Sequence, residues 1–296
     1  MWPKKIIARI EGGLGNQLFQ YAAARSLADR LGLELALDLR GLVENGDRPF
    51  ALDLYRIRAC IATSSELSGL PHWRPTRVGR MRSRISQRFP SYFSFPLFWP
   101  SSFSYDYRIE RIRKPVYMVG YWQSEKYFKW NRMRVLEDVQ LRNPLSVHGP
   151  MLDMIRRCTS VALHVRRGDY VTNPVAAQFH GLCDIRYYQR AVDEMKVKLK
   201  NFTIFVFSDD SEWSRKNLKF DVPTYIVEGE PVERSSVDLE LMSQCQHHII
   251  ANSSFSWWGA WRRKSPQQHV YAPSRWFLDL KTNTSDVIPS NWHTLD

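Results

Sequence analysis

Cysteine pairs are missing from the sequence. The four cysteines, Cys60, Cys158, Cys183 and Cys245, are scattered along 296 residues, and none forms a C-x-x-C pair. This spacing argues against a zinc knuckle and against a disulfide framework. We therefore expect reduced, partly buried thiols.

Long apolar runs are also missing. No stretch approaches the roughly 18 consecutive apolar residues that suggest a membrane-spanning helix. The basic start, MWPKKIIARIEGG, lacks the apolar stretch and small-residue cleavage site of a signal peptide. The sequence therefore predicts a cytoplasmic protein, and the glycosylation sequons at Asn201, Asn252 and Asn283 are expected to be chance matches.

Acidic residues are absent from 67–105, which instead carries six arginines and a proline- and aromatic-rich stretch, PSYFSFPLFWPSSFSY. We expect an insertion with little regular structure beside the first sheet. Two interpretations stay open. The segment is either a loop packed by its own aromatic side chains, or a patch that binds the acceptor or touches the inner membrane peripherally.

Positive charge is in excess. Lys and Arg number 42 against 30 Asp and Glu, a formal net charge of +12. Such a balance favours an anionic partner, either a nucleotide diphosphate, an acidic lipid or a nucleic acid. Charge alone does not choose among them, and an ordinary solvated surface is the alternative.

Strands alternate with helices throughout. In the first half, the patterns predict strands at 4–10, 33–39 and 115–120, a helix from Asn16 to a C-cap at Gly32, and a helix through about residue 138. The second half predicts further strands and helices in alternation, with strands at 161–165, 203–207, 223–227 and 247–251 and helices at 185–199, from about 211, at 237–245 with an N-cap at Ser235 or Ser236, and through 257–261. This order indicates doubly wound parallel sheets in two α/β domains, 1–148 and 149–296, divided near 143–150.

Four motifs follow predicted strands, where ligands bind in open α/β sheets. The first is Gly12-Gly13-Leu14-Gly15-Asn16-Gln17, whose glycines let a ligand approach the backbone. A tight turn explains the glycines equally well, and Asn16 is either a sugar contact or a helix cap.

The second motif runs from His164 through Arg166, Arg167 and Gly168 to Asp169. Adjacent arginines at a strand end suit an anionic ligand, because a guanidinium fork matches a phosphate. The alternative is an ion pair with Asp169.

The third and fourth motifs offer carboxylates and hydroxyls. Asp209 and Asp210 can bind a metal, act as a base, accept hydrogen bonds from a nucleotide, or cap a helix. The stretch Asn252-Ser253-Ser254-Phe255-Ser256-Trp257-Trp258-Gly259-Ala260-Trp261 places hydroxyls at a helix start, a second phosphate cradle. Its tryptophans are expected to pack the helix onto the sheet.

Together these motifs resemble the α-1,2-fucosyltransferases of glycosyltransferase family 11. The matching stretches are GGLGNQLFQYA (12–22), YWQSEKYF (121–128), HVRRGDYV (164–171), IRYYQRAV (185–192), FSDD (207–210) and the region from Asp238 through NSSFSWWGAW (252–261). The resemblance implies a GT-B-like fold of two Rossmann-type lobes, with the donor site between them. It also implies GDP-fucose as co-substrate, no metal or other cofactor, and inversion at the anomeric carbon.

The resemblance also assigns roles to residues. Arg166 is expected to contact the donor diphosphate, Asn16 to face the fucose, and His164 to assist on the nucleotide side. Asp209, Asp210 and Asp238 are expected to hold the guanosine, and Ser254, Phe255 and Ser256 the phosphates and base. The neighbouring motif residues complete the expected substrate contacts: Gly13, Gly15, Arg167, Asn252 and Ser253.

The sequence thus predicts a galactoside α-1,2-fucosyltransferase acting on a galactose-terminated glycan. The general base stays open among Glu11, Asp38 and Asp169. One alternative is another GDP-fucose-dependent transferase, α-1,6 or protein O-fucosyl. A nucleic-acid-binding protein is the other, and it leaves the strand-end motifs unexplained.

Overall fold

The computed structural model describes residues 4–45, 48–68, 70, 97–100, 102–143, 149–228, 235–263, 265, 267–279 and 282–296. The chain divides into two compact units. Unit 1 comprises Met1–Gln140 and Ser285–Val287, and unit 2 comprises Leu141–Thr284 and Ile288–Asp296. The division falls just before the 143–150 stretch, and the sequence does not predict the return of 285–287 to unit 1.

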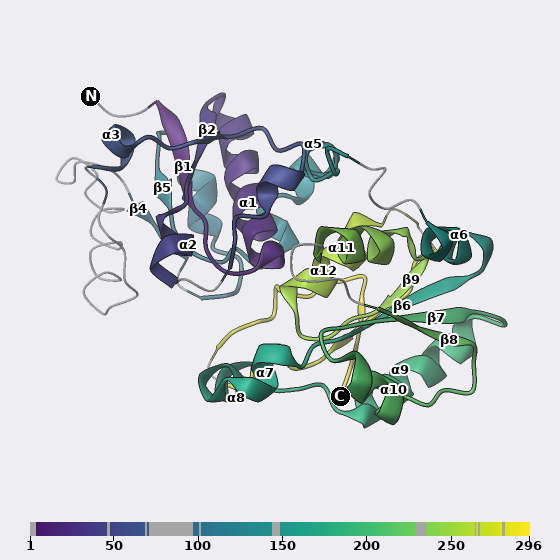
Figure 1. Ribbon diagram of the computed structural model, residues 1–296. Coiled ribbons are helices and arrows are strands. Elements are labelled where there is room, and N and C mark those ends of the chain that lie inside the picture. The colour runs from purple at the N-terminus through teal and green to yellow at the C-terminus, as the bar shows by residue number, and fades with distance from the viewer. Residues whose placement is uncertain are drawn as a thin grey trace. The chain divides into compact units, whose positions relative to one another are not determined.

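Unit 1 is built on a parallel sheet. Its described strands lie in the order β3 (Cys60–Ile61), β2 (Glu34–Asp38), β1 (Lys5–Arg9), β5 (Tyr117–Met118) and β4 (Leu97–Phe98). Helix α1 (Leu14–Leu31) connects β1 to β2 (Figure 1). Shorter elements complete the unit, namely α2 (Arg40–Asn45), η1 (Leu52–Leu54), α3 (Ser64–Leu67), η3 (Tyr107–Arg111), η4 (Glu125–Tyr127), η5 (Lys129–Asn131) and α5 (Arg132–Asp138).

Three local predictions for unit 1 need correction or restriction. Asn16 does not cap α1, because Gly13 is the N-cap and Asn16 lies in the first turn. The helix expected after YWQSEKYF and through about residue 138 is limited to Arg132–Asp138, and the short turns η4 and η5 precede it. Within 67–105, strand β4 belongs to the sheet, whereas 69, 71–96 and 101 lie outside the described residues. The predicted C-cap at Gly32 is confirmed, with φ of 65°.

Helix α1 is buried on nearly all sides, so it is fixed by polar as well as apolar contacts. The Tyr21 hydroxyl donates to Asp138 Oδ2 at 2.8 Å, and Arg25 Nε donates to the same oxygen at 2.9 Å. The backbone N–H of Arg58 donates to the Tyr21 hydroxyl. These bonds satisfy the buried polar groups and tie α1 to α5, which holds the glycine-rich start of α1 in one position.

Unit 2 has the strand order of a dinucleotide-binding fold. Its described strands are all parallel, in the order β11 (His293–Leu295), β10 (Val270–Pro273), β9 (His247–Ile249), β6 (Ser160–Val165), β7 (Thr203–Ser208) and β8 (Thr224–Val227). Numbered within the unit from β6, this is the doubly wound order 3-2-1-4-5-6. The sequence analysis did not predict β10 and β11. The predicted fold class, α/β with two Rossmann-type units, is confirmed.

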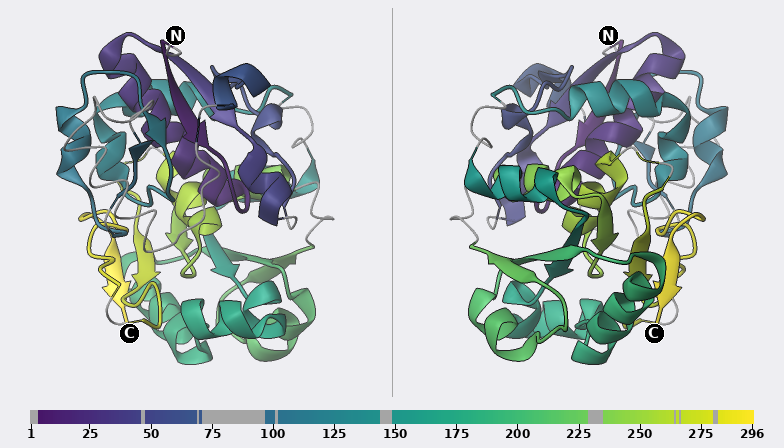
Figure 2. Two further views of the ribbon diagram at one scale, coloured as in Figure 1. Left: turned by 90° about the vertical axis from the view of Figure 1, so that its left-hand side faces the viewer. Right: turned by 90° about the vertical axis from the view of Figure 1, so that its right-hand side faces the viewer.

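Helices cover both faces of the second sheet. Figures 1 and 2 show α9 (Ile185–Lys198) and α10 (Ser211–Asn217) against one face, and α6 (Pro150–Arg157), α11 (Ser235–Gln244) and α12 (Ser254–Arg262) against the other. The short helices α7 (Gly168–Thr172) and α8 (Pro174–His180) follow β6. The sequence predicts Ser235 or Ser236 as the N-cap of α11. Both residues instead lie within the helix. None of the described helices is long and apolar enough to cross a membrane.

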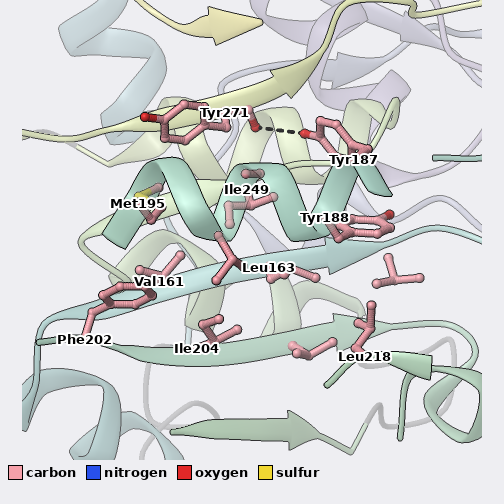
Figure 3. Close-up of a cluster of buried hydrophobic side chains, with 14 residues drawn as sticks. Val161, Leu163, Tyr187, Tyr188, Met195, Phe202, Ile204, Leu218, Ile249 and Tyr271 are labelled. Carbon is pink, nitrogen blue, oxygen red and sulfur yellow. Dashed lines mark hydrogen bonds between the residues drawn. The ribbon is translucent and has the colours of Figure 1, made fainter. Parts of the chain in front are cut away.

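Alternating strand residues build the core under α9. Val161, Leu163 and Val165 of β6 point to this face and pack with Tyr188 and Met195 of α9 (Figure 3). Because successive strand residues point to opposite faces, Ala162 and His164 lie on the α12 side. The pattern of β6 therefore aims His164 away from the α9 core.

The buried ring of His248 makes the stability of unit 2 depend on pH. It is fully buried in β9, where its Nε2 pairs with the Met242 carbonyl at 2.8 Å and its Nδ1 with Gln268 Nε2 at 3.0 Å. Burial lowers the pKa of His248 to about 3, and the neighbouring charges of His247 and Arg263 lower it too, against the Met242 hydrogen bond. The folded protein therefore keeps this ring neutral at pH values where the unfolded chain binds a proton.

We expect acid to destabilise the wild type more steeply than His248→Gln. Below the unfolded pKa of about 6.5, the free energy of unfolding falls by about 1.4 kcal/mol per pH unit for one such histidine. Urea denaturation between pH 6 and pH 4 measures both slopes, with His293→Gln at an exposed position as the matched control. Equal slopes in wild type and His248→Gln would contradict the assignment.

Candidate functional site

The strand order of unit 2 defines where a ligand binds. Strand β6 pairs with β7 on one side and β9 on the other, and the strand order reverses between β6 and β9. In such sheets the ligand crevice lies at this switch point, beyond the carboxyl ends of the strands. The segments leaving β6, β7 and β9 there carry the second, third and fourth sequence motifs.

Two ion pairs join the ends of β6 and β7. Arg166 Nη1 lies 2.7 Å from Asp209 Oδ2, and Arg167 Nε lies 3.0 Å from Asp210 Oδ2. The backbone N–H of Arg167 also donates to Asp209 Oδ1 at 2.8 Å. Among the described side chains, the arginines therefore pair with Asp209 and Asp210, and an ion pair with Asp169, the alternative expectation, stays a prediction. Asp169 lies in α7, and its side chain lies outside the described part.

Aromatic faces flank both arginines. The Arg166 guanidinium lies over the Tyr170 ring, 5.3 Å from its centroid, and that of Arg167 lies 4.2 Å from the Trp213 centroid. Asp210 also caps α10, because its Oδ1 accepts from the N–H of Trp213. The guanidiniums are thus held by carboxylates on one side and rings on the other.

Gly168 permits the close approach of Asp209. A Cβ at Gly168 would lie 2.7 Å from Asp209 Oδ2 and 3.1 Å from its Cγ. Asp209 is already fixed by two partners, so a larger residue would force it away from them. Glycine is needed here for space, and its conformation is not of the left-handed kind.

His164 is a neutral group beside the arginines. It is 5% exposed, and its ring lies 5.6 Å from that of Phe255. Burial lowers the pKa of His164 to about 4, and Arg166 lowers it further, whereas Asp209 raises it. Its Nδ1 is buried without a hydrogen-bond partner among the described residues.

The start of α12 faces the same switch point from β9. Ser253 is the N-cap, and its Oγ accepts from the N–H of Phe255 at 3.3 Å. Ser254 and Phe255 form the first turn, whereas the fully buried Ser256 donates its hydroxyl to backbone carbonyls of Ala251 and Ser253. The exposed amide groups of a helix start attract anions, so Ser254 and Phe255 are better placed than Ser256 to contact a phosphate.

The side chain of Asn252 holds neighbouring segments of unit 2 together through hydrogen bonds. Its Nδ2 donates to the carbonyls of His180, Gly181 and Trp276, the first at 2.8 Å. Its Oδ1 accepts from the Cys183 thiol at 3.6 Å. Asn252 therefore joins two segments, 180–183 and the one around Trp276, to the residues that follow β9.

The remaining predicted residues of unit 2 lie on α11 and α12. Asp238 is in the first turn of α11, which packs on α12. Trp257, Trp258 and Trp261 are buried, which confirms that they pack α12 in place. Among the described residues, no three His, Cys, Asp or Glu side chains are grouped so as to hold a metal ion.

In unit 1, glutamines shape the glycine-rich turn. Gln17 donates to the carbonyls of Gly12 and Pro49 and accepts from the N–H of Ala51. Gln20 accepts from the N–H of Glu11 at 3.0 Å. Both side chains are buried. The sequence analysis did not assign these residues a role, although GNQLFQ repeats Gln at a three-residue step on one helix face.

Asn16 is held beside the same turn. Gln123 Nε2 donates to Asn16 Oδ1 at 2.9 Å, so the amide orientation is fixed. Gly12 has φ of 77°, and a Cβ there would lie 2.8 Å from Asn16 Nδ2. Gly13 precedes the helix as its cap, and Gly15 is buried within it. This turn follows β1, at the switch point between β1 and β5 in unit 1.

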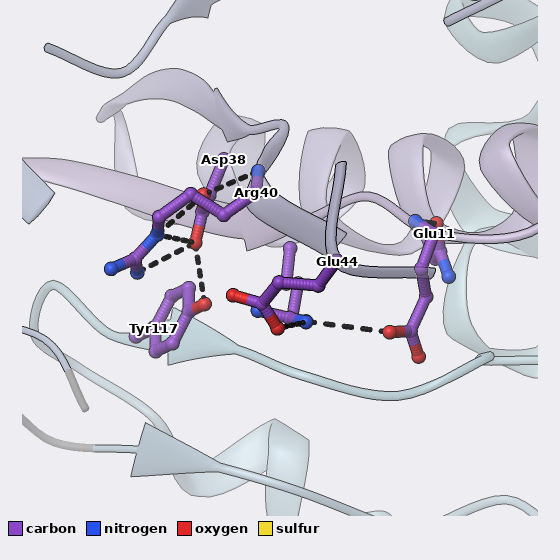
Figure 4. Close-up of polar contacts among 7 residues, drawn as sticks. Glu11, Asp38, Arg40, Glu44 and Tyr117 are labelled. Atoms are coloured by element: carbon purple, nitrogen blue, oxygen red, sulfur yellow. Dashed lines mark hydrogen bonds and ion pairs between the residues drawn. The ribbon is translucent and has the colours of Figure 1, made fainter. Parts of the chain in front are cut away.

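Two of the candidate bases, Asp38 and Glu11, differ in burial and in hydrogen bonding. Figure 4 shows Asp38 held by Arg40 and by the Tyr117 hydroxyl, which donates at 2.6 Å. Burial opposes the charge, but the hydrogen bonds from Arg40 and Tyr117 outweigh it and lower the pKa of the fully buried Asp38. Glu11, by contrast, lies two residues beyond the end of β1 and has a partly exposed carboxylate 3.3 Å from Arg9 Nε.

Comparison with known proteins shows which family the chain resembles. The sequence model described as glycosyl transferase family 11 matches residues 102–284. The chain is 34% identical to an alpha-1,2-colitosyltransferase of Escherichia coli, over 97% of each protein. It is 29% identical to the E. coli O-antigen biosynthesis glycosyltransferase WbnK, over 97% of this chain and 99% of the relative. Galactoside alpha-(1,2)-fucosyltransferase 2 of Sus scrofa is 26% identical, over 88% and 69%.

Solved structures share the fold. A variant of Arabidopsis thaliana FUT1 in complex with GDP superposes with a TM-score of 0.53 at 12% identity, covering 99% of this chain and 76% of the other. The NodZ alpha-1,6-fucosyltransferase soaked with GDP-fucose gives 0.50 at 15% identity, covering 88% and 92%. These identities are low, so the likeness establishes the fold alone.

The position of Asn252 predicts a loss of stability when its amide is removed. In Asn252→Ala, three backbone carbonyls lose their donor, so we expect the free energy of unfolding to fall by about 2–4 kcal/mol. Urea denaturation measures the change, with Asn201→Ala at an exposed position as the control within about 0.5 kcal/mol. Wild-type stability in Asn252→Ala would show that its contacts are not structural.

Proposed function

The chain belongs to glycosyl transferase family 11, and on that premise we propose that it is a galactoside α-1,2-fucosyltransferase. In this proposal it transfers L-fucose from GDP-fucose to the 2-hydroxyl of a terminal β-galactoside in a glycan, with inversion and without a metal. The observation that carries the proposal is the pair of arginines fixed at the switch point of a dinucleotide-type sheet, beside the start of α12.

Arg166 stabilises the leaving group in this mechanism. As the bond between the anomeric carbon and the diphosphate lengthens, negative charge grows on GDP. A guanidinium remains charged throughout and offers a fork of donors to phosphate oxygens. The N–H groups at the start of α12, near Ser254 and Phe255, supply a second positive end.

Asp209 and Asp210 position the arginines. Both carboxylates bond a guanidinium, and Asp209 also fixes the backbone of Arg167. A donor group that is already oriented needs no reorganisation when charge develops, which is the main source of electrostatic catalysis. We assign the guanosine contacts to the same region together with Asp238, as the family resemblance implies.

On the acceptor side, Glu11 is the better base of the two that unit 1 offers. Asp38 is buried, bonded by three donor groups and stabilised as a carboxylate, so it is poorly suited to take a proton. Glu11 has a partly exposed side chain beside the turn that positions Asn16. Asn16, oriented by Gln123, contacts the fucose in this proposal.

Colitose is the second candidate for the transferred sugar. The relative of 34% identity over 97% of both proteins is named an alpha-1,2-colitosyltransferase, and colitose is fucose without its 3-hydroxyl. A site that hydrogen-bonds a hydroxyl rejects the analogue that lacks it, whereas an apolar site discriminates weakly. The ratio of kcat/KM for the two donors therefore reports which kind of site is present.

Transfer assays test the reaction directly. We expect GDP-fucose to be consumed with a panel of β-galactosides in the presence of EDTA, and the product to show an α-1,2 linkage by NMR. A preference for GDP-colitose would replace the fucose assignment and leave the linkage intact. Products linked at another position, or loss of transfer in EDTA, would contradict the acceptor position or the metal independence respectively.

Arg166→Ala tests the role of the arginine. We expect kcat to fall by about 10²–10³-fold, the usual effect of removing one donor to developing negative charge, with little change in the urea midpoint. Arg166→Lys should recover only part of the rate, because it keeps the charge but loses the fork. The control is Arg186→Ala, whose side chain is 90% exposed and pairs with Asp184. A wild-type kcat in Arg166→Ala would exclude the proposed role.

A further inference from the structure

A groove in unit 1 lies apart from the glycine-rich turn that follows β1. Its volume is about 800 Å³, within the range of about 300–1,000 Å³ typical of ligand sites. It is bordered by the second half of α1, by η3 and by the turns η4 and η5. Its lining includes Leu27 and Arg30 of α1, Ile109 and Glu110 of η3, Lys126 of η4 and Trp130 of η5.

The groove is too far from the glycine-rich turn to hold the reacting sugar. Ser26 follows Asn16 by ten positions on α1 and Arg30 by fourteen. At 1.5 Å per residue, these positions lie about 15 and 21 Å along the helix from Asn16. Because α1 runs back from the carboxyl end of β1, the groove is displaced toward the amino ends of the strands. It is a separate site in unit 1.

Its walls combine apolar faces with aromatic rings. Leu27 and Ile109 are buried, as is Tyr127, whose ring lies 4.8 Å from that of Tyr105. Trp130 stands at the rim with 61% of its surface exposed. A large aromatic side chain exposed beside a groove is favourable for a partner that has an apolar face of its own.

The cations that line the groove already have partners. Lys126 pairs with Asp286, which Ser285–Val287 brings into unit 1, and Lys129 pairs with Glu125 at 2.9 Å. Arg30 donates to the Ile109 carbonyl at 2.6 Å, and Glu110 accepts from the Tyr105 hydroxyl at 2.7 Å. The two lysines of the lining are thus bonded to carboxylates and Arg30 to a carbonyl, so a nucleotide or an acidic lipid would have to displace these partners.

Hydrogen-bonding groups of both kinds meet in this groove. Arg30, Lys126 and Lys129 are donors, and Glu110 is an acceptor. On the floor, Ser26 is 1% exposed and its hydroxyl has no hydrogen-bond partner among the described residues. A ligand rich in hydroxyls, each both donor and acceptor, can pair with the donors and with the acceptor of the rim, whereas a purely anionic ligand offers no donor to Glu110.

We propose that this groove is an accessory binding site for a neutral oligosaccharide, with a sugar ring packed on Trp130 and its hydroxyls bonded to the charged rim. A pyranose presents an apolar C–H face together with equatorial hydroxyls, which matches an aromatic platform within a polar rim. The inference goes beyond the proposed transfer reaction, because it concerns a second carbohydrate contact that takes no part in the chemical step.

The indole N–H of Trp130 provides a groove-specific signal. The protein has 11 tryptophans, and the ¹⁵N–¹H resonance that disappears in Trp130→Phe identifies the one at residue 130. Neutral tetrasaccharides, one ending in β-galactose and one of β-1,4-linked glucose, are titrated into the full chain in the presence of saturating GDP. We expect at least one tetrasaccharide to shift the Trp130 signal in a saturable way, and GDP alone to leave it unmoved.

Variants give the expected magnitudes. In saturation-transfer titrations, Trp130→Ala should raise the Kd of the bound tetrasaccharide at least tenfold. Trp130→Phe should keep most of the wild-type affinity. Tyr107→Ala is the matched control, because Tyr107 is equally exposed at 61% but does not line the groove. Trp130→Ala should also keep wild-type kcat and KM for transfer to a galactoside disaccharide.

The proposal and the transfer function fail in different ways. No saccharide-dependent shift of the Trp130 signal, unchanged affinity in Trp130→Ala, or a shift only with phosphatidylglycerol vesicles would overturn the groove assignment. None of these results depends on turnover. Absence of transfer from either GDP-sugar would contradict the proposed reaction and leave the binding result standing.

Discussion

The site of unit 2 depends on the two ion pairs between the ends of β6 and β7. The four side chains are between 19% and 34% exposed, and pairs that water reaches contribute only about 0–1 kcal/mol to stability. The ion pairs therefore serve to position the arginines and add little to the stability of the fold. Strand register places Val165 opposite Ser208, so the residues that follow leave the sheet side by side, and each arginine meets the aspartate of the adjacent strand. Gly168 keeps that approach open, because any Cβ would collide with Asp209.

Much of this arrangement follows from sequence because it rests on local rules. Buried β-branched runs that end in Arg-Arg, Asp-Asp and Asn-Ser-Ser predict strands and strand-end motifs, and parallel pairing brings such ends together. Other features depend on contacts distant in the chain. The bonds of Asn252 to His180, Gly181 and Trp276 could not be foreseen, nor could the pairing of Arg166 with Asp209 and of Arg167 with Asp210. Strands β10 (VYAP) and β11 (HTL) escaped prediction because a proline ends the first and the second is too short to show a period.

Polar side chains inside unit 1 serve to shape a turn. Gln17 and Gln20 bond backbone groups on both sides of the glycines, since a turn that approaches a ligand cannot satisfy its own amides through a sheet. Asp38, Arg40 and Tyr117 do the same for the neighbouring strand end. The abundance of polar residues at this edge is thus partly structural, which is why sequence alone left three carboxylates equivalent as bases and why burial and hydrogen bonding separate Asp38 from Glu11.

The neutral state of His164 has a consequence for the pH dependence of the site. The arginines remain charged at every relevant pH, and the burial that lowers the pKa of His164 to about 4 keeps that ring uncharged above this value. Neither the arginines nor His164 therefore changes charge between about pH 5 and 9. A general base on the acceptor side must change protonation to work, and the pH profile of kcat/KM reports such groups in the free enzyme. A titration in that interval must therefore come from a group other than these arginines and His164. The choice of acceptor base can then be addressed by the pH profile of carboxylate variants without confusion from Arg166, Arg167 or His164.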